Sequence, residues 1–329
     1  MHYRATIAAV TLAALGLAAP AQAQQYPSKN ITIIVPLAAG TGMDLIARMY
    51  GEKLSANLGR SVIIENRPGA SLSLAATAVA QAEPDGHTLG IATTTVMVVN
   101  PVLMKNLRYN PKTDFAPIAL YVKSPFVFIS TPALGPKTVP EFIAMAKKRE
   151  AEKNPLSYAS LGAGASQHLS MEYLKQLFKV DILHVPYKVT TQAVGDIAAG
   201  HVSAGFSEIG ASLGLIRDGK LNALAVSSAT ELPALPGVKP FAEAGNAPGF
   251  ELVSWHILLA PAKTPRPIVE RLHNEMKTIM ADPGITKKIS DMGLLPHTTP
   301  DFGGMEKYIA SEAEKWGKVV RDLGLEGSQ

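Results

Sequence analysis

The feature of the sequence that most constrains the fold is an alternation of short β-branched runs with longer amphipathic segments. Strands are expected at 31–35, 61–65, 87–93, 116–121, 126–130, 156–160, 181–185, 202–206, 223–227 and 250–259. Helices are expected at 43–58, 72–81, 139–153, 167–178, 191–199, 211–218, 267–280, 285–292 and 301–323. Strands that alternate with helices predict an α/β fold, with mainly parallel sheets and helices on both faces.

Two glycine-containing loops each follow an expected strand and open an expected helix. They occupy residues 35–44 and 160–168. A helix start leaves about four backbone N–H groups without intrahelical partners, and it favours an anion such as a carboxylate or phosphate. Glycine lets a ligand approach the backbone closely. Either loop can equally be a plain strand-to-helix connection, because such turns need glycine in any case.

Single residues in these loops also have structural interpretations. Asp44 stands where a carboxylate caps a helix or interacts with its dipole, and Ser166 is a suitable N-cap. His168 is either a ligand donor or a structural histidine, and His184, in a strand, is more typical of packing. Trp255 is either the floor of a cleft or a core residue.

Composition and motifs argue against several function classes. The chain has no cysteine and its eight histidines are scattered, so we expect no disulfide, no metal site and no cofactor. A net charge of +4 over 329 residues does not indicate nucleic-acid binding. The second loop lacks the Gly-Lys-Ser/Thr ending of a nucleotide loop, and no Gly-x-Ser-x-Gly elbow of a hydrolase is present.

The N-terminus predicts export. Arg4 precedes an uncharged apolar run at 5–19, and the small-x-small sequence AQA occupies 21–23. This is the pattern of a secretory signal peptide, residues 1–23, which is removed to leave 24–329. A membrane anchor is the alternative, but the run is shorter than the ~20 residues that span a bilayer. We therefore expect an exported protein, and the length of the mature chain, residues 24–329, suggests two domains.

The mature sequence resembles the extracytoplasmic solute-binding proteins of tripartite tricarboxylate transporters, the Bug family. The stretch YPSKNITIIVP at 26–36 resembles the family's opening strand, and GMD at 42–44 with Arg48 resembles its first ligand loop. Further matching motifs, in order, are ENRPGA at 65–70, PDG at 84–86, NP at 100–101, YNP at 109–111, DFAPI at 114–118, YAS at 158–160, GAG at 162–164, His168, HVPYK at 184–188, ALAV at 223–226, Trp255 and APAKTP at 260–265.

The resemblance implies a type II periplasmic-binding-protein fold, in which two α/β lobes are joined by crossing strands and hold the ligand in the cleft between them. Lobe one would comprise 24–121 plus 250–329, and lobe two 122–249. The implied function is capture of a small organic acid, a di- or tricarboxylate or an aromatic carboxylate, and delivery to the membrane components of a tripartite tricarboxylate transporter. The protein would be a monomer and not an enzyme. The alternatives are an exported α/β enzyme that acts on a carboxylate and a ligand-sensing partner of a membrane kinase.

The loops and the resemblance together give a set of candidate ligand-binding residues. They are Leu37, Ala39, Gly40, Thr41, Gly42, Asp44, Ser73, Thr93, Ser160, Gly162, Gly164, Ser166, His168, Tyr187 and Ser207. The chain departs from the family pattern at Leu37, 71–74 (SLSL), Val189 and Ser207-Glu208. Leu72 and Leu74 could therefore add apolar lining to the pocket, or they could be core residues.

Overall fold

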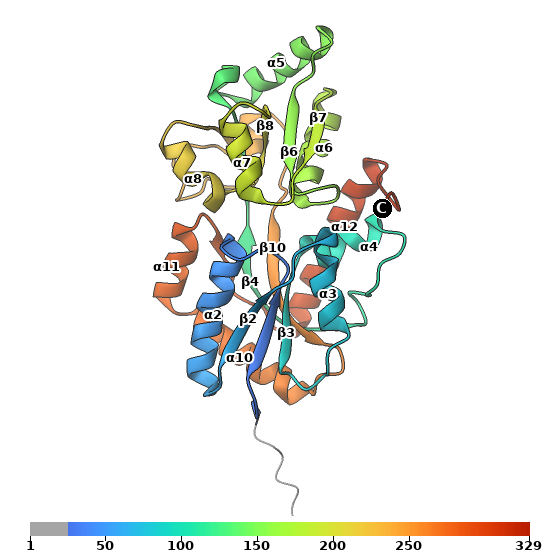
Figure 1. Cartoon of the computed structure of the whole chain (residues 1–329), viewed down its shortest axis with the longest axis vertical. Helices are drawn as coiled ribbons and strands as arrows, with labels where there is room; N and C mark the ends of the chain where they lie inside the picture. The colour runs from blue at the N-terminus through green and yellow to red at the C-terminus, as the bar shows by residue number, and fades with distance from the viewer. Residues whose placement is uncertain (1–25) are drawn as a thin grey trace, which may run out of the picture.

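The computed structural model describes residues 26–329, so the expected signal peptide lies outside the described residues. Two sheets organise this part of the chain (Figure 1). The first sheet has the order β11-β4-β10-β3-β1-β2, with β1 (Ile31–Val35), β2 (Val62–Asn66), β3 (Thr88–Thr93), β4 (Phe115–Ser124), β10 (Ser254–Pro261) and β11 (Leu295–Pro296). The second has the order β7-β6-β8-β5-β9, with β5 (Phe126–Ser130), β6 (Ser157–Ser160), β7 (Leu183–Pro186), β8 (Ala204–Glu208) and β9 (Asn222–Val226).

Both sheets are mixed, so the α/β class expected from the sequence is confirmed. The expectation of mainly parallel pairing is wrong, because five of the nine strand pairs in the described residues are antiparallel. β1 pairs in parallel with β2 and β3, and β6 pairs in parallel with β7 and β8. Every antiparallel pair involves β4, β5 or β10, and these are the strands next to the two crossings between the sheets. The chain leaves β4 and enters β5 through Pro125 alone, and it returns from β9 to β10 through residues 227–253.

Helices cover both faces of each sheet. In chain order they are α2 (Gly42–Leu58), α3 (Ser73–Ala80), α4 (Asn100–Leu103), α5 (Val139–Ala151), α6 (Ser166–Phe178), α7 (Thr190–Ala198), α8 (Ile209–Arg217), α9 (Phe241–Ala244), α10 (Arg266–Met280), α11 (Pro283–Asp291) and α12 (Phe302–Asp322). Short 3-10 turns occupy Ala70–Leu72 and Pro132–Leu134, and a π-helical turn occupies Thr95–Val99. No helix among residues 26–329 is both long and apolar enough to span a bilayer.

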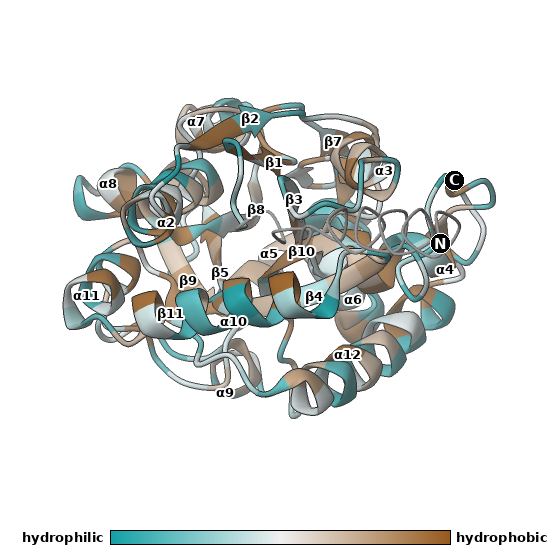
Figure 2. Ribbon diagram, turned by 90° about the horizontal axis from the view of Figure 1, so that it is seen from below, coloured by the Kyte–Doolittle hydropathy of each residue, from teal (hydrophilic) through white to brown (hydrophobic). Residues whose placement is uncertain are grey.

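The apolar runs of the first sheet are continuous because both faces of this sheet are buried. Ile31 and Ile33 of β1 pack in a cluster with residues of α2 and α10, whereas Ile34 packs in the cluster that includes α3 and α12. Alternate side chains of a strand point to opposite faces, so a strand covered on both sides is apolar throughout. The covering helices α10 and α12 carry both hydrophilic and hydrophobic stretches of surface (Figure 2), as expected for helices with one wet face.

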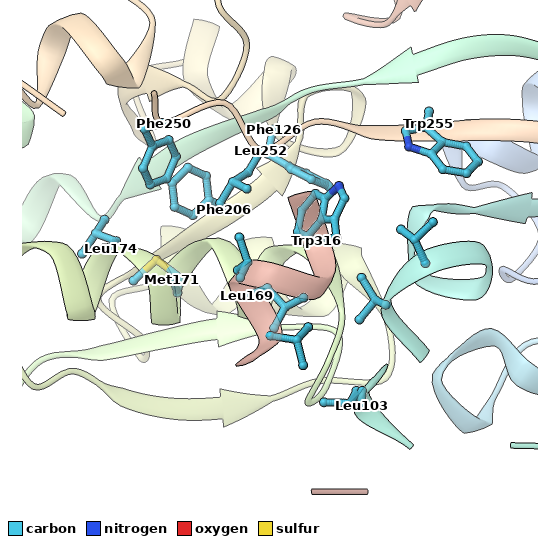
Figure 3. Close-up of a cluster of buried hydrophobic side chains, with 14 of the residues drawn as sticks. Leu103, Phe126, Leu169, Met171, Leu174, Phe206, Phe250, Leu252, Trp255 and Trp316 are labelled. Carbon is cyan, nitrogen blue, oxygen red and sulfur yellow. The ribbon is translucent and has the colours of Figure 1, made fainter. Parts of the chain in front are cut away.

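One apolar cluster extends from the first sheet to the second and packs the two halves together on one side (Figure 3). It contains Trp255 of β10 and Trp316 of α12, whose indole N–H groups donate to the same Oε2 of Glu312 at 3.0 and 3.1 Å. Of the two roles considered for Trp255, the structure supports the core role, since its side chain is fully buried and lines neither the inner cavity nor the outer hollow. From the second half, Phe206 and Phe250 stack in the same cluster.

Candidate functional site

Two connected hollows lie where the halves face each other. The inner cavity has a volume of about 60 Å³, and the outer hollow about 420 Å³. Both are lined by Met43, Ser124, Glu208 and His256, so they are adjoining parts of one cleft. The outer volume lies within the range of roughly 300–1,000 Å³ that small-molecule pockets occupy. Because β8 and α6 contribute from one half and β10 and α2 from the other, the cleft is a site between two sheets.

Three buried polar atoms on the wall of the inner cavity have no hydrogen-bond partner among residues 26–329. They are Oγ1 of Thr93, Oγ of Ser166 and Nδ1 of His256. These residues are at most 4% exposed. A buried polar atom without a partner costs about 1–3 kcal/mol, so native proteins rarely keep three together. The inner cavity therefore offers three hydrogen-bonding atoms to a polar group of a ligand.

The N-terminus of α6, the helix that begins at Ser166, adds backbone N–H donors to this wall. The N-cap of α6 is Ala165, whose methyl group cannot accept a hydrogen bond from the first-turn N–H groups, and Ser166 is the first helical residue. The expected N-cap role of Ser166 is therefore wrong, and its hydroxyl is left for the cavity. Ala165, Ser166 and Gln167 all line the inner cavity, so the positive end of the α6 dipole lies at its edge.

The N-terminus of α2 is arranged differently, because it has a side-chain cap and a hydrogen-bond network around Asp44. Thr41 Oγ1 accepts from the backbone N–H of Asp44 at 3.4 Å. The Asp44 carboxylate accepts from the N–H of Gly40 at 2.9 Å, from Arg48 at 3.0 Å and from Asn66 at 3.0 Å. The two glycine loops are thus not equivalent: α6 has no side-chain cap, whereas α2 is capped by Thr41 and its loop lines the outer hollow.

The segment before α3 contributes a strained wall to the inner cavity. Ala70, Ser71 and Leu72 have φ values of 46°, 50° and 68°, which is the left-handed region. Three successive non-glycine residues in this region are unusual. The Ser71 carbonyl accepts from Nδ2 of the fully buried Asn100 at 2.9 Å, which helps to hold the segment in place. Ser71 and Leu72 line the cavity, so this fixed backbone shapes the site.

Two titratable side chains, His256 and Glu208, line both hollows. Burial lowers the pKa of His256 to about 4, so its ring is neutral at pH 7. Burial raises the pKa of the Glu208 carboxyl above its ordinary value. No group of three or more His, Asp or Glu side chains in residues 26–329 is placed to hold a metal ion.

Seven of the candidate residues line the two hollows. Leu37, Thr93 and Ser166 line the inner cavity, and Ala39, Gly40, Thr41 and Gly42 line the outer hollow. Ser160 and Ser207 instead border a hollow of only about 10 Å³, where Oγ of Ser160 contacts Nε2 of His184 at 2.7 Å.

The other six candidates line neither the inner cavity nor the outer hollow. Asp44 is occupied by the α2 loop network, and Tyr187 donates to Asp196 at 2.7 Å. His168 Nδ1 accepts from the N–H of Gly164, and its ring packs against His184, which supports a structural role for both histidines. Ser73 lines a separate surface hollow.

The two remaining candidates are glycines of the α6 loop. Gly162 has φ +104° and open space around it. A Cβ on Gly164 would lie 2.0 Å from Cδ2 of Leu103, so this glycine is required by close packing against α4 of the other half. Of the two leucines considered as extra lining, Leu72 lines the inner cavity, while Leu74 is half exposed.

Several lining residues were not among the candidates, chiefly Ser124, Gln167, Glu208, Ser254 and His256. One signal for them existed in the sequence. Polar residues at the ends of otherwise apolar strands, as in Ser124 and Glu208, are the positions that a two-sheet fold brings to the cleft.

Comparison with known proteins agrees with this geometry. Residues 46–325 match the model of the tripartite tricarboxylate transporter family receptor. Protein BugT of Bordetella pertussis is 30% identical over 96% of this chain and 95% of its own length. A UPF0065 protein of Agrobacterium vitis is 33% identical over 96% of this chain and 91% of its own.

Solved structures show the same architecture. An R. palustris protein with adipate has a TM-score of 0.84 and 32% identity, covering 91% of this chain and 98% of its own. The periplasmic binding protein BugD has a TM-score of 0.83 and 30% identity, covering 92% and 99%. MatC from Rhodopseudomonas palustris with bound malate has a TM-score of 0.80 and 30% identity, covering 90% and 100%.

Proposed function

Because the chain belongs to the family of tripartite tricarboxylate transporter receptors, we propose that it binds a small organic carboxylate in the periplasm and delivers it to a tripartite tricarboxylate transporter. It is a solute-binding protein and not an enzyme. The relatives with adipate and with malate support a carboxylate ligand for this chain. The proposed export to the periplasm rests on the signal peptide expected at residues 1–23.

The observation that carries the proposal is the polar wall of the inner cavity. A carboxylate placed there accepts from Ser166 Oγ, Thr93 Oγ1 and the first-turn N–H groups of α6. Charge-assisted hydrogen bonds of this kind are the strong ones. The neutral His256 ring can donate through Nδ1 in the matching tautomer. A single carboxylate thus supplies partners for all three unpaired atoms.

We further propose that the two sheets and their helices are two lobes that close on the ligand. The apolar cluster that includes Leu103, Phe250 and Trp316 keeps one side packed, and Gln176 of α6 donates to the Asp322 carbonyl of α12 on that side. The opposite side, where α7 and α8 face α2 and α11, holds the outer hollow (Figure 1). A ligand that touches Ser166 on one half and Thr93 on the other favours closure through contacts to both.

Calorimetric titration with succinate, malate and adipate tests the proposal, followed by NMR of the recovered acid. We expect saturable binding, thermal stabilisation and unchanged acid. At about 100 times its Kd a ligand stabilises the native state by about 2.7 kcal/mol. No binding of these acids, of longer and aromatic carboxylates, or of their amino derivatives would overturn the carboxylate assignment.

Ser166→Ala locates the binding site. The lost hydrogen bond to a charged group should weaken binding about ten- to a hundredfold. The free energy of unfolding of the unliganded protein should stay the same or rise, because the variant removes a buried hydroxyl that has no partner. Ser311→Ala on the exposed face of α12 is the matched control and should leave binding unchanged. Equal binding by wild type and Ser166→Ala would place the ligand elsewhere.

Uptake of the carboxylate by cells that lack this chain tests the transporter role. We expect uptake to be lost in these cells, and to be restored by the wild-type chain but not by Ser166→Ala. Unchanged uptake with an altered transcriptional response would favour the sensor alternative.

A further inference from the structure

The charge of the cleft lining is unusual for a protein that takes up anions. Among the described residues, neither the inner cavity nor the outer hollow is lined by a lysine or an arginine. Two carboxylates, Glu208 and Asp291, do line them. The possible donors for an anion are therefore neutral side chains and helix N-termini, which include those of α6 and α2, and both charged side chains of the described lining are acidic.

The two carboxylates differ in their surroundings. Asp291 is exposed at the mouth of the outer hollow, and Nζ of Lys287 lies 2.7 Å from its Oδ2. Glu208 is the last residue of β8 and lines both hollows. No hydrogen bond or ion pair within residues 26–329 uses its side-chain oxygens, although its backbone carbonyl accepts from Ser212. Its Oε2 would lie 4.0 Å from a Cβ placed on Gly42, so the carboxylate reaches across the cleft to the first residue of α2.

A partly buried carboxylate without a partner disfavours a second anion beside it and favours a cation. A ligand whose first carboxylate occupies the polar wall at Ser166 and Thr93 extends toward Met43, Ser124 and His256, the residues shared by both hollows. Glu208 belongs to that same shared set. The next polar group of the ligand therefore meets Glu208, and a protonated amine at this point both neutralises the carboxylate and donates to it.

We propose that this cleft selects amino carboxylates, with the ligand's carboxylate held at Ser166, Thr93 and the α6 N-terminus and its ammonium group paired with Glu208. The proposal rests on the carboxylate-binding function proposed above. It gives Glu208 the role of a specificity-determining residue that discriminates zwitterionic ligands from simple dianions.

Matched ligand pairs that differ only in the amino group test the proposal by calorimetry at pH 7.5. The pairs are aspartate and succinate, glutamate and glutarate, and 4-aminobutyrate and butyrate. We expect at least one amino member to bind wild type tenfold or more tightly than its partner. In Glu208→Gln, which keeps the shape and removes the charge, that ratio should fall to about one or below.

The matched control is Glu243→Gln, at an exposed residue of α9 in the same half of the molecule, whose carboxylate pairs with Lys239. Its ratio should equal that of wild type. The unfolding midpoint of each variant in urea establishes that the proteins are folded. If Glu208→Gln does not fold, Glu208→Asp replaces it, and the shortened carboxylate should reduce the ratio without reversing it.

The outcomes separate the two proposals. Tighter binding of the simple carboxylate in every pair, or a ratio unchanged in Glu208→Gln, would overturn the inference and leave the carboxylate-binding function standing. In particular, succinate or glutarate binding that Glu208→Gln preserves would mean that Glu208 acts as a neutral hydrogen-bond partner of a second carboxylate. Absence of binding by both members of every pair would overturn the inference, and it would overturn the carboxylate-binding function as well only if malate, adipate and the longer and aromatic carboxylates also fail to bind.

Discussion

Replacing Ser71 with glycine should stabilise the unliganded protein and weaken ligand binding. Ser71 has φ +50° and lies between two other left-handed residues, Ala70 and Leu72. Left-handed backbone costs an L-residue about 1–2 kcal/mol, whereas glycine adopts it freely. Glycine loses about 0.5–1 kcal/mol more conformational entropy on folding, so the net gain should be about 0.5–1 kcal/mol.

The contacts of Ser71 favour a clean experiment. Its backbone carbonyl accepts from Asn100, and glycine retains this carbonyl. The matched control is Ser73→Gly, two residues later at the start of α3, where φ is −73° and ψ is −22°. In this right-handed backbone glycine should destabilise the protein by about 0.5 kcal/mol. Urea unfolding of both variants and wild type therefore should give changes of opposite sign.

Calorimetry on the same proteins measures the functional consequence. Because the fixed segment forms the wall of the inner cavity, Ser71→Gly should bind its carboxylate more weakly, through loss of preorganisation. Destabilisation by Ser71→Gly equal to that of Ser73→Gly would refute the idea that this segment stores backbone strain.

Three further predictions concern the packing around the site. Gly164→Ala should lower the free energy of unfolding by about 3 kcal/mol, because alanine disfavours the left-handed backbone and its Cβ clashes with Leu103. A double-mutant cycle with Leu103→Ala should show non-additivity of more than about 0.5 kcal/mol. Additive effects of the two substitutions would contradict the contact. Burial lowers the pKa of His168 from 6.5 to about 4, so the unfolded state binds a proton first as pH falls. The free energy of unfolding should therefore decrease as the pH falls from 6.5 to 4, by up to about 3 kcal/mol for this residue. His168→Asn should flatten the plot of urea midpoint against pH over that range. An unchanged slope would exclude His168 as a source of the pH dependence. Glu312→Leu should lower the free energy of unfolding by about 3 kcal/mol, because it leaves two buried indole N–H groups unpaired. Glu312→Gln keeps an acceptor oxygen and should lower it by about 1 kcal/mol or less. Equal losses in the two variants would contradict the role of Glu312 as shared acceptor.

Strongly periodic segments were predictable from the sequence. The expected helix at 43–58 is α2 (Gly42–Leu58), and the expected helix at 301–323 is α12 (Phe302–Asp322). Elements that exist through tertiary contacts were not predicted. β11 is two residues that pair with β4, and the π-helical turn Thr95–Val99 lies in an apolar β-branched run that by itself favours a strand.

The candidate site was predictable in outline and not in its chemistry. Glycine loops after strands led to Gly40, Thr41 and Ser166, which do line the cleft. The sequence could not show that Asn66, far from the loop in the chain, helps to fill the hydrogen-bonding capacity of Asp44. The two loops therefore differ in their side-chain caps and hydrogen-bond networks, which depend in part on tertiary contacts.

Glu208 illustrates the same limit. Its departure from the family pattern is visible in the sequence, but its lack of a partner and its place in both hollows follow only from the packing of β8 against the opposite half. A residue's charge is a property of the sequence, whereas its desolvation and its neighbours are properties of the fold.

The most direct test of the central claim is a crystal structure of the protein with its tightest-binding carboxylate. Our account predicts a carboxylate group of the ligand in the inner cavity, with its oxygens within hydrogen-bonding distance of Ser166 Oγ and Thr93 Oγ1 and of a first-turn N–H of α6. The gap between α8 and α2 should be narrower than in the unliganded protein. A ligand bound outside the cleft, or an inner cavity that holds only water at saturating ligand, would contradict the account.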